Sequence, residues 1–573
     1  MTLQGLSRLV FLIVLIALPA GAAEPFDVLI KGGTVYDGSG SPPFTGDVAV
    51  AGDRIVAIGP HLSGDAKVIV NAAGKAVSPG FINMLAHPEE SLLIDGRGLS
   101  DLVQGVTLEV LGEDSMGPLS PQMKALAKAR QGDIKYEVTW TTLGDYLQQL
   151  EARGISPNVA SFVGEGTVRE NLLGERDIQP TSDQRAAMRG LVRQAMEEGA
   201  LGLTTALIYA PNTYAKTDEL IDMAKVSAQC GGVFSAHIRN EGDRLLEALD
   251  EIITISKASG GPAEVYHFKQ SGKDNWGLLD AAVAKVNQAR ADGVRITADM
   301  YPYTASATGL DASMPAWVQD GGLEAWIARL KDPAIRKRVK AEMEDAHPSW
   351  DNAYQHAGPS GVLLLGFKSK ALKSLTGKTL AEVAASRGVS PAETAMDLVV
   401  EDGSRIEVAY FGMNEANIRR ELTLPWMSID SDESAPAPEG VFLLSQPHPR
   451  AYGAFARVLG HYARDEKVLS LTEAVRRLTR LPADTLALKD RGRLEVGAYA
   501  DIVVFDPNRI QDLATFARPA QLAVGVEQVL VNGAFALKDG QATRAPTGRF
   551  VHGRAWTGAP GGGCRQAASD WSW

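Results

Sequence analysis

The chain has 573 residues, of which 45% are hydrophobic and 22% are charged, the balance of an ordinary globular protein. This length exceeds that of one small domain, so two or more domains are expected. The net charge of -12 argues against a nucleic-acid-binding protein, which would carry a basic face, and no run of Lys and Arg marks a membrane-surface patch.

The first 23 residues have the composition of a secretory signal. One positive residue, Arg8, precedes the unbroken apolar run 9–18, and the small residues 19–23 follow it. An uncleaved anchor is the alternative, but a membrane span needs about 20 apolar residues. We expect cleavage near Ala23, a mature chain that is secreted or periplasmic, and no membrane association after cleavage.

Short strands joined by Gly-rich turns are predicted at both ends of the remaining chain. They lie at 27–30, 46–50 and 54–58, and again at 500–506, 526–531 and 534–537. Asn532-Gly533 between two apolar runs is a strong hairpin signal. We expect residues 24–78 and 488–552 to form one small composite β-sandwich, with a catalytic domain over 79–487 between them.

The catalytic segment alternates strand and helix patterns. Eight strands are predicted, at 80–86, 106–112, 158–164, 201–206, 233–237, 264–268, 295–299 and 426–430. Helical stretches such as 184–199 and 217–229 separate them. This alternation is typical of a parallel α/β architecture, here a (β/α)8 TIM barrel. An insertion over about 304–424, between the seventh and eighth strands, is interpreted as a lid over the rim; its predicted helices include one over 323–343.

The two cysteines, Cys230 and Cys564, permit a disulfide in an exported protein but give no disulfide framework. Cys230 lies in a helix-to-strand turn and is interpreted as structural, with no metal-binding or nucleophilic role. The tail 553–573, rich in Gly, Ala and Trp, is expected to be poorly ordered.

Three successive predicted strands end in polar residues. His237 and His267 are 30 residues apart, and Asp299 follows 32 residues later. A (β/α)8 barrel averages about 31 residues per unit, and barrel enzymes keep their chemistry at the C-terminal rim. Two neutral imidazoles on adjacent strands can bind a metal. The spacing favours a metal site, and two core histidines one repeat apart are the alternative.

Short motifs run through the chain in a fixed order. They read VSPGFI at 77–82, QGVT at 104–107, GALGL at 199–203, SAHIRNEG at 235–242, HFK at 267–269, DMYPYTAS at 299–306, SD at 431–432, HPR at 448–450 and GAYADIV at 497–503. In this order and spacing they resemble the amidohydrolase superfamily, and within it the N-acyl-D-amino-acid deacylase (D-aminoacylase) family. The resemblance covers about residues 25–552 and implies a metal-dependent hydrolase that acts on an amide.

The resemblance also implies roles for individual residues. His237 and His267 are expected to bind the metal, and Asp432 to take a proton from metal-bound water and pass it to the leaving nitrogen. The chemistry is sound, because Zn²⁺ can lower the pKa of bound water from 15.7 to about 7, within reach of a carboxylate base. The alternative for Asp432 is a rim carboxylate or cap between the acidic neighbours Asp430 and Glu433.

The sequence departs from the family pattern at three places. The His-x-His expected after the first strand begins with Leu85, which cannot bind metal, so that only His87 remains, as a ligand or as a neighbour. The cysteine ligand expected after the second strand is replaced by Glu113 or Asp114, and reach and position favour Glu113. A histidine expected after the third strand is Glu165.

Two interpretations of these losses follow. In the first, one divalent metal, most simply Zn²⁺, is bound by Glu113, His237 and His267 with water in the open position, the usual arrangement of catalytic zinc. A site with two ions is the alternative. In the other, the protein no longer catalyses. The first is favoured because both histidines and Asp432 are present. Exchange of thiolate for carboxylate makes the site harder and less zinc-selective.

An N-acyl amino acid presents a carboxylate, which a buried Arg or Lys would bind. Lys269 lies two residues past His267 and therefore points to the same strand face. The resemblance adds Tyr301 and Arg450 as substrate-binding candidates. An ordinary salt bridge or a packed rim residue is the alternative for each.

The sequence thus predicts a secreted, metal-dependent amidohydrolase that cleaves N-acyl amino acids, with the D configuration implied by the resemblance. A cyclic-amide hydrolase of the hydantoinase or dihydroorotase type is the second interpretation. Such enzymes usually rely on a carboxylated lysine bridging two metals, and the predicted third and fourth strands contain no Lys. The third interpretation is a non-catalytic amidohydrolase-like binding protein.

Overall fold

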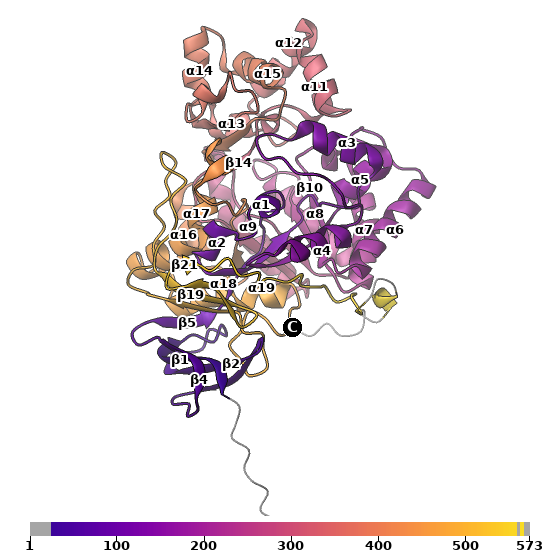
Figure 1. The fold of residues 1–573 in the computed structure, drawn as a ribbon. Helices are drawn as coiled ribbons and strands as arrows, with labels where there is room; N and C mark the ends of the chain where they lie inside the picture. Colours follow the sequence, from indigo (N-terminus) through magenta and orange to yellow (C-terminus); the bar gives the residue numbers. More distant parts are fainter. Residues whose placement is uncertain (1–24, 559–561, 566–573) are drawn as a thin grey trace, which may run out of the picture.

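The computed structural model of the protein describes residues 25–558 and 562–565 (Figure 1). The predicted signal segment, residues 1–23, lies outside them. Among the described residues, every helix is too short or too polar to cross a bilayer. The centre of the molecule is an α/β barrel, and each of the eight predicted barrel strands is present.

The barrel strands follow one another in parallel around a common core. They are β6 (Phe81–Asn83), β7 (Val106–Leu111), β8 (Asn158–Ser161) with its short continuation β9 (Val163–Gly164), β10 (Gly202–Ala206), β11 (Val233–His237), β12 (Ala263–Val265), β13 (Ile296–Met300) and β17 (Met427–Ile429). The last strand returns to the first: Met84 N donates to Ile429 O at 3.5 Å, and Asp432 N donates to Leu85 O at 2.9 Å. The C-terminal ends of all the strands therefore meet at one rim.

The helices between the strands pack one apolar face on the barrel. They include α6 (Ser182–Glu197), α7 (Thr217–Gln229), α8 (Leu245–Ser259) and α9 (Leu279–Ala291). Helix α6 starts at a capping box, in which the Thr181 side chain accepts from Gln184 N and the Gln184 side chain accepts from Thr181 N. Helix α8 ends at Ser259 and is capped by Gly260, whose φ of 75° is readily adopted only by glycine. Its buried face includes Leu249 and Ile252, each worth about 1.5–3 kcal/mol by burial.

Both ends of the chain contribute to one nine-stranded sheet. Its strands, in chain order, are β1 (Phe26–Val35), β2 (Phe44–Ala51), β3 (Arg54–Gly59), β4 (Ala66–Asn71), β5 (Ala76–Pro79), β18 (Ile502–Phe505), β19 (Val526–Val531), β20 (Ala534–Lys538) and β21 (Gln541–Ala542). Strand β18 pairs antiparallel with β5, which joins the two ends. The predicted hairpin is confirmed: Asn532 and Gly533 connect β19 to β20 with φ of 50° and 81°, the left-handed values that a type I′ turn requires.

The insertion forms a compact unit with its own hydrophobic core. A three-stranded antiparallel sheet of β14 (Ser306–Gly309), β16 (Glu407–Tyr410) and β15 (Val362–Gly366) carries helices α11 (Leu323–Leu330), α12 (Pro333–Met343), α13 (Ala353–Ala357), α14 (Leu380–Arg387) and α15 (Pro391–Asp402). The single helix predicted over 323–343 is wrong, because Asp332 caps a new helix that begins at Pro333. In Figure 1 this unit lies at the end of the barrel opposite to β1, β2 and β4.

Part of the C-terminal tail is fixed to the barrel, so the expectation of poor order is wrong for residues 553–558 and 562–565. Cys564 is buried and forms a disulfide with Cys230, at the end of α7. Ala555 is buried as well. From its composition, the tail was expected to keep its conformational entropy and stay poorly ordered. The disulfide and the buried side chains offset the cost of losing that entropy. The structural role predicted for Cys230 is met by this bond.

Candidate metal-binding active site

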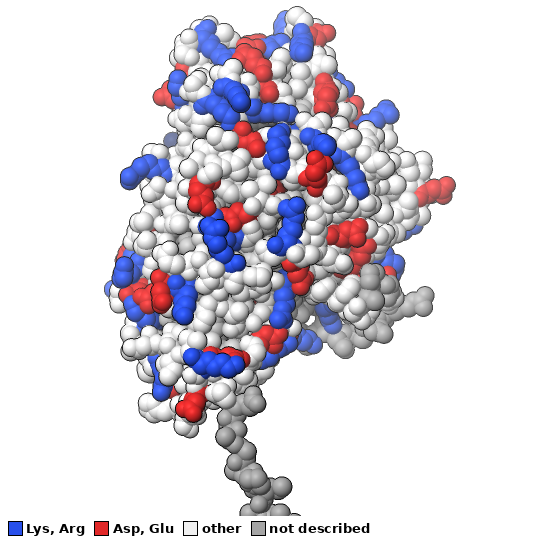
Figure 2. Space-filling model, in the orientation of Figure 1, with Lys and Arg blue, Asp and Glu red and all other residues white. Residues whose placement is uncertain are grey.

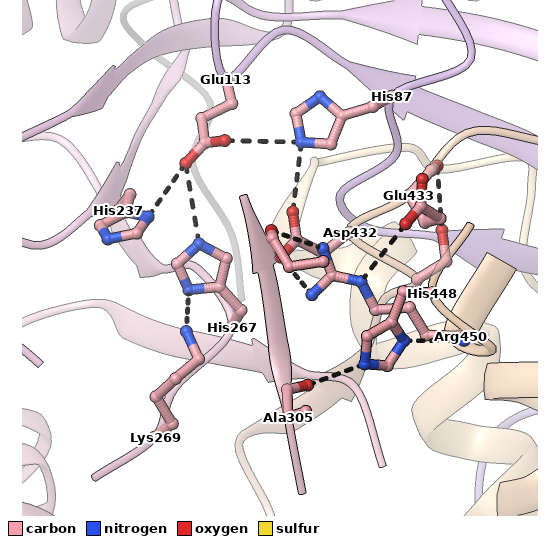
Figure 3. Close-up of polar contacts among 12 residues, drawn as sticks. His87, Glu113, His237, His267, Lys269, Ala305, Asp432, Glu433, His448 and Arg450 are labelled. Carbon is pink, nitrogen blue, oxygen red and sulfur yellow. Dashed lines mark hydrogen bonds and ion pairs between the residues drawn. The ribbon is translucent and has the colours of Figure 1, made fainter. Parts of the chain in front are cut away.

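Five polar side chains converge where the barrel strands end (Figure 3). His237 is the last residue of β11, and the other four lie in the loops that follow β6, β7, β12 and β17. Those four are His87, Glu113, His267 and Asp432. The structure therefore brings together the proton-transfer candidate and all four metal-ligand candidates that the sequence suggested.

Glu113, His237 and His267 form the first candidate metal group. Glu113 Oε1 lies 3.3 Å from His237 Nδ1 and 3.6 Å from His267 Nε2. Ligands about 2 Å from a tetrahedral zinc ion are separated by about 3.3 Å. Glu113 Oε1 is buried and makes no hydrogen bond within the described chain, although these two nitrogens surround it. The donor set and this unsatisfied oxygen fit a bound divalent cation.

His87, Glu113 and Asp432 form a second, less complete group. His87 Nε2 lies 3.4 Å from Glu113 Oε2 and 3.2 Å from Asp432 Oδ1. Leu85, at the position where the resemblance expects another imidazole, is fully buried and offers only its backbone carbonyl to Asp432 N. Asp114 belongs to neither group; its carboxylate accepts a hydrogen bond from Asn212 at 3.3 Å.

Charges around the site keep both acidic residues ionised. Burial alone would raise the pKa of Glu113, but the imidazoles of His237, His267 and His87 lower it well below its ordinary value. Burial would likewise raise the pKa of Asp432, but Arg450, followed by two of the imidazoles, lowers it to about 2. Arg450 Nη1 lies 2.8 Å from Asp432 Oδ2, and the arginine is 2% exposed.

A further carboxylate, Glu241, supports the imidazoles from behind, and the sequence interpretation did not single it out. Its Oε1 lies 3.0 Å from His267 Nδ1 and 2.7 Å from Lys269 Nζ. Lys269 Nζ is also 2.7 Å from His267 Nδ1. The backbone N–H of Glu241 donates to the carboxylate of Asp351, a residue of the insertion. The only sequence signal for Glu241 was its place four residues after His237 in one motif.

The backbone is held in unusual conformations at the site. His267 has a φ of 38° and Asp432 a φ of 47°, both in the left-handed region that non-glycine residues seldom adopt. Such strain persists where surrounding contacts enforce it and gathers at functional sites. Gly112, with a φ of 111°, precedes Glu113, and a side chain there would meet the backbone of Phe162. The turn that presents Glu113 therefore requires glycine.

The group opens into a cavity of about 420 Å³ between the barrel and the insertion. All three predicted substrate-binding residues, Lys269, Tyr301 and Arg450, line it. The Arg450 guanidinium lies 4.3 Å from the centre of the Tyr301 ring. Strand β12 ends at Val265, so Lys269 reaches the cavity from the loop and not from a shared strand face. The insertion contributes a further wall, which includes Thr308, His356, Arg405, Glu407 and Tyr410.

Two other acidic residues that the sequence singled out, Asp299 at a predicted strand end and Glu165 at an expected histidine position, belong to neither candidate metal group. Asp299 is fully buried in β13, where its carboxylate accepts a hydrogen bond from the backbone N–H of His267. Glu165 is fully buried beside the ion pair of Arg169 and Glu219 and belongs to neither candidate metal group. The histidine that the resemblance expected at this position therefore has no acidic replacement in the site.

A barrel that gathers imidazoles and carboxylates at its C-terminal rim has the architecture of a barrel hydrolase. The chain belongs to the amidohydrolase family, whose sequence profile matches residues 68–536. It is thus a hydrolase of carbon–nitrogen bonds other than peptide bonds. Figure 2 shows acidic and basic side chains interspersed over one face of the molecule.

Characterised relatives extend over nearly the whole chain. It is 33% identical to N-acyl-D-glutamate deacylase of Alcaligenes xylosoxydans xylosoxydans, over 94% of this chain and 99% of that protein. It is also 33% identical to D-aminoacylase of the same organism, over 92% and 98%. A crystal structure of D-aminoacylase, described as defining a novel subset of amidohydrolases, matches with a TM-score of 0.76 at 31% identity and covers 92% of this chain and 100% of that one.

A second solved structure is N-acyl-D-glutamate deacylase from Bordetella bronchiseptica, complexed with zinc and a phosphonate inhibitor that mimics the tetrahedral intermediate. Its TM-score is 0.75 at 29% identity, over 92% of this chain and 100% of that chain. A further D-aminoacylase structure is described in terms of a binuclear metal centre with one-metal activation and second-metal attenuation.

Proposed function

We propose that the protein is a metal-dependent deacylase of N-acyl-D-amino acids. The observation that carries the proposal is the group of Glu113, His237 and His267 beside Asp432 at the barrel rim. Two characterised relatives, each covered almost completely, act on N-acyl-D-amino acids by their names. The position of the cavity directly above this group gives a substrate access to it.

Glu113, His237 and His267 would hold one divalent ion, with zinc the simplest choice for two imidazoles and a carboxylate. Such an ion polarises the amide carbonyl and makes a water molecule nucleophilic at neutral pH. Glu241 orients the imidazole of His267 through its free nitrogen, as carboxylates beside metal-binding histidines commonly do. His87 would bind a second ion only with incomplete ligation, because Leu85 supplies no donor.

Asp432 is the proton carrier of the proposed reaction. Its carboxylate is ionised, and its Oδ1 faces the same imidazole, His87, that contacts Glu113. It would accept a proton from the attacking water and deliver it to the amide nitrogen as that nitrogen leaves. Lys269, Tyr301 and Arg450 line the cavity and would bind the α-carboxylate of the substrate.

The insertion is proposed as a lid. It supplies one wall of the cavity and is fixed to the rim by the hydrogen bond of Glu241 N to Asp351. We also propose the domain division suggested by the sequence, with the sheet of both chain ends as a composite β-sandwich. Export to an oxidising compartment is supported by the Cys230–Cys564 disulfide, since such bonds persist mainly outside the cytosol.

The two alternative functions receive less support. Among the described residues that line the cavity, the one lysine is Lys269, and it is bound to Glu241 and His267. It therefore does not bridge two metal groups as a carboxylated lysine would. A non-catalytic protein would have no need to keep strained backbone at both His267 and Asp432.

The test combines metal analysis with turnover. Purified protein should contain about one equivalent of divalent metal and should release acid from N-acetyl-D-amino acids faster than from their L enantiomers. Asp432→Asn should keep the metal and lose about 10²- to 10⁴-fold in kcat, whereas the neighbouring Glu433→Gln should change kcat far less. Metal-free, inactive protein would refute the proposal. N-terminal sequencing of protein from cell fractions tests export.

A further inference from the structure

One cation of the insertion faces the cavity with its charged end accessible. Arg405 immediately precedes Ile406 and strand β16, lines the cavity, and has a side chain that is 53% exposed. Its Nε lies 2.9 Å from Asp311 Oδ2. Within the described chain its two terminal nitrogens, Nη1 and Nη2, have no hydrogen-bond partner of their own. One edge of the guanidinium is therefore used and the other is available.

A guanidinium can bind two carboxylates at once, one on each edge, and this protein already contains an example. Arg130 binds Glu175 through Nη1 and Nη2, each at 2.8 Å, and Glu324 through Nη2 at 2.8 Å. Asp311 binds one edge of the Arg405 guanidinium, and the other edge can bind a second carboxylate as Arg130 does.

The guanidinium lies near the candidate metal group. The ring of Tyr209 packs 5.2 Å from the ring of His237, and Arg405 Cζ lies 5.2 Å from the centre of the same Tyr209 ring. The distance from the Arg405 guanidinium to the His237 ring is therefore at most the sum of these two 5.2 Å distances. A carbonyl about 2 Å from a metal ion and three further carbon–carbon bonds of about 1.5 Å each reach at most about 6.5 Å, and a hydrogen bond of about 2.9 Å to the guanidinium spans most of the remainder.

The backbone around Arg405 is fixed in a strained conformation. Ile406 has a φ of 56°, which is an outlier for a β-branched residue. Leu310 N donates to both Arg405 O and Ile406 O, at 2.8 Å and 2.9 Å. These contacts tie the arginine to the segment that carries Asp311. Strain of this kind is a reason to look for a function at the residue it positions.

We propose that Arg405 binds a second carboxylate of the substrate, so that the enzyme selects N-acyl-D-amino acids that carry an acidic group besides the α-carboxylate. The inference rests on the proposed function and names its substrate class. The second carboxylate is that of an acidic side chain, as in D-glutamate or D-aspartate, or that of a dicarboxylic acyl group. Two carboxylates, Asp114 and Asp311, act on the charge of the same guanidinium, so an anionic group is repelled there unless the arginine is present.

The experiment compares acidic substrates with neutral substrates of nearly the same shape. N-acetyl-D-glutamate is paired with N-acetyl-D-glutamine, N-acetyl-D-aspartate with N-acetyl-D-asparagine, and N-succinyl-D-alanine with N-butyryl-D-alanine. The readout is the ratio of kcat/KM within each pair for the wild type, Arg405→Met and Arg405→Lys. Arg387→Met, an insertion arginine paired with Glu401 outside the cavity, is the matched control.

The wild type should favour the acid by about 10- to 100-fold in one pair, the range expected for hydrogen bonds to a charged group. Arg405→Met should abolish or invert this ratio. Arg405→Lys, which keeps a charge beside Asp311 and guards against misfolding, should reduce it. Arg387→Met should preserve it. The pair that shows the preference distinguishes a side-chain carboxylate from an acyl carboxylate.

The same pairs are measured for binding to zinc-loaded Asp432→Asn protein by calorimetry, which does not depend on turnover. Binding selectivity that disappears in Asp432→Asn/Arg405→Met, without turnover of any substrate by the wild type, would uphold the role of Arg405 and overturn the proposed deacylase function. Turnover with equal ratios in wild type and Arg405→Met would overturn the role of Arg405 and leave the deacylase intact. The role of Arg405 would also be overturned if the wild type preferred the uncharged substrate in every pair.

Discussion

Glu113 is the residue on which the candidate metal site depends, since one of its oxygens belongs to each candidate group. Replacement by Gln keeps the shape and removes the charge. Structural zinc is bound with about 10–16 kcal/mol over four ligands, or about 3 kcal/mol for each. The first group has three protein ligands, so loss of the charged one should weaken metal binding by about 10²-fold or more.

The assay is metal content after dialysis against a graded chelator, followed by titration of the apoprotein with zinc. Glu113→Cys supplies a thiolate in place of the carboxylate and should restore binding with a preference for softer ions. Asp114→Asn is the matched control, because Asp114 is the adjacent acidic residue outside both groups. If Glu113→Gln retained wild-type metal affinity, the single-ion arrangement derived from these distances would be refuted.

Two further predictions concern stability. Replacement of both Cys230 and Cys564 by Ser should lower the free energy of unfolding by about 2–4 kcal/mol; an unchanged denaturant midpoint would show that the tail contributes nothing. Burial raises the pKa of Glu421, at the end of α16 (Glu415–Glu421), to about 8, so the folded chain keeps a proton that the unfolded chain loses above about pH 4.5. This residue should therefore make stability fall as pH rises from about 4.5 to 8, by at most about 1.4 kcal/mol per pH unit. Glu421→Gln should remove that slope in denaturation series at pH 5, 6.5 and 8, and an identical slope would contradict the assignment.

The barrel was predictable because its strands and helices carry strong local patterns. Helix α7 matches its predicted range of 217–229, and strands β11 and β19 match theirs of 233–237 and 526–531. Strand β12 was predicted too long, over 264–268, because the apolar run continues past Val265. What ends that strand is the left-handed backbone of His267, which tertiary contacts impose and no local signal announces.

The candidate ligands were predictable for a different reason: they stand at strand ends, where one repeat length separates the histidines. Residues that reach the site through space were not. Arg405 comes from the insertion, more than a hundred residues after the candidate metal-ligand histidines, and nothing in its neighbourhood distinguishes it from other surface arginines. Cys564 likewise finds Cys230 across 334 residues, and the sequence permitted this one pairing without showing that the bond forms.

The contacts of His87 bear on how many ions the site is built for. Its Nε2 faces both Glu113 Oε2 and Asp432 Oδ1, and an imidazole protonated on that nitrogen can share its single Nε2–H between the two carboxylates. To bind an ion there, Nε2 would have to give up that proton, and Leu85 would add no ligand in return. With one ion on Glu113, His237 and His267, His87 remains a hydrogen-bond bridge that holds Asp432 beside the reacting group. The loss of the second imidazole therefore fits a one-ion site in which Asp432 stays free of metal and able to carry a proton.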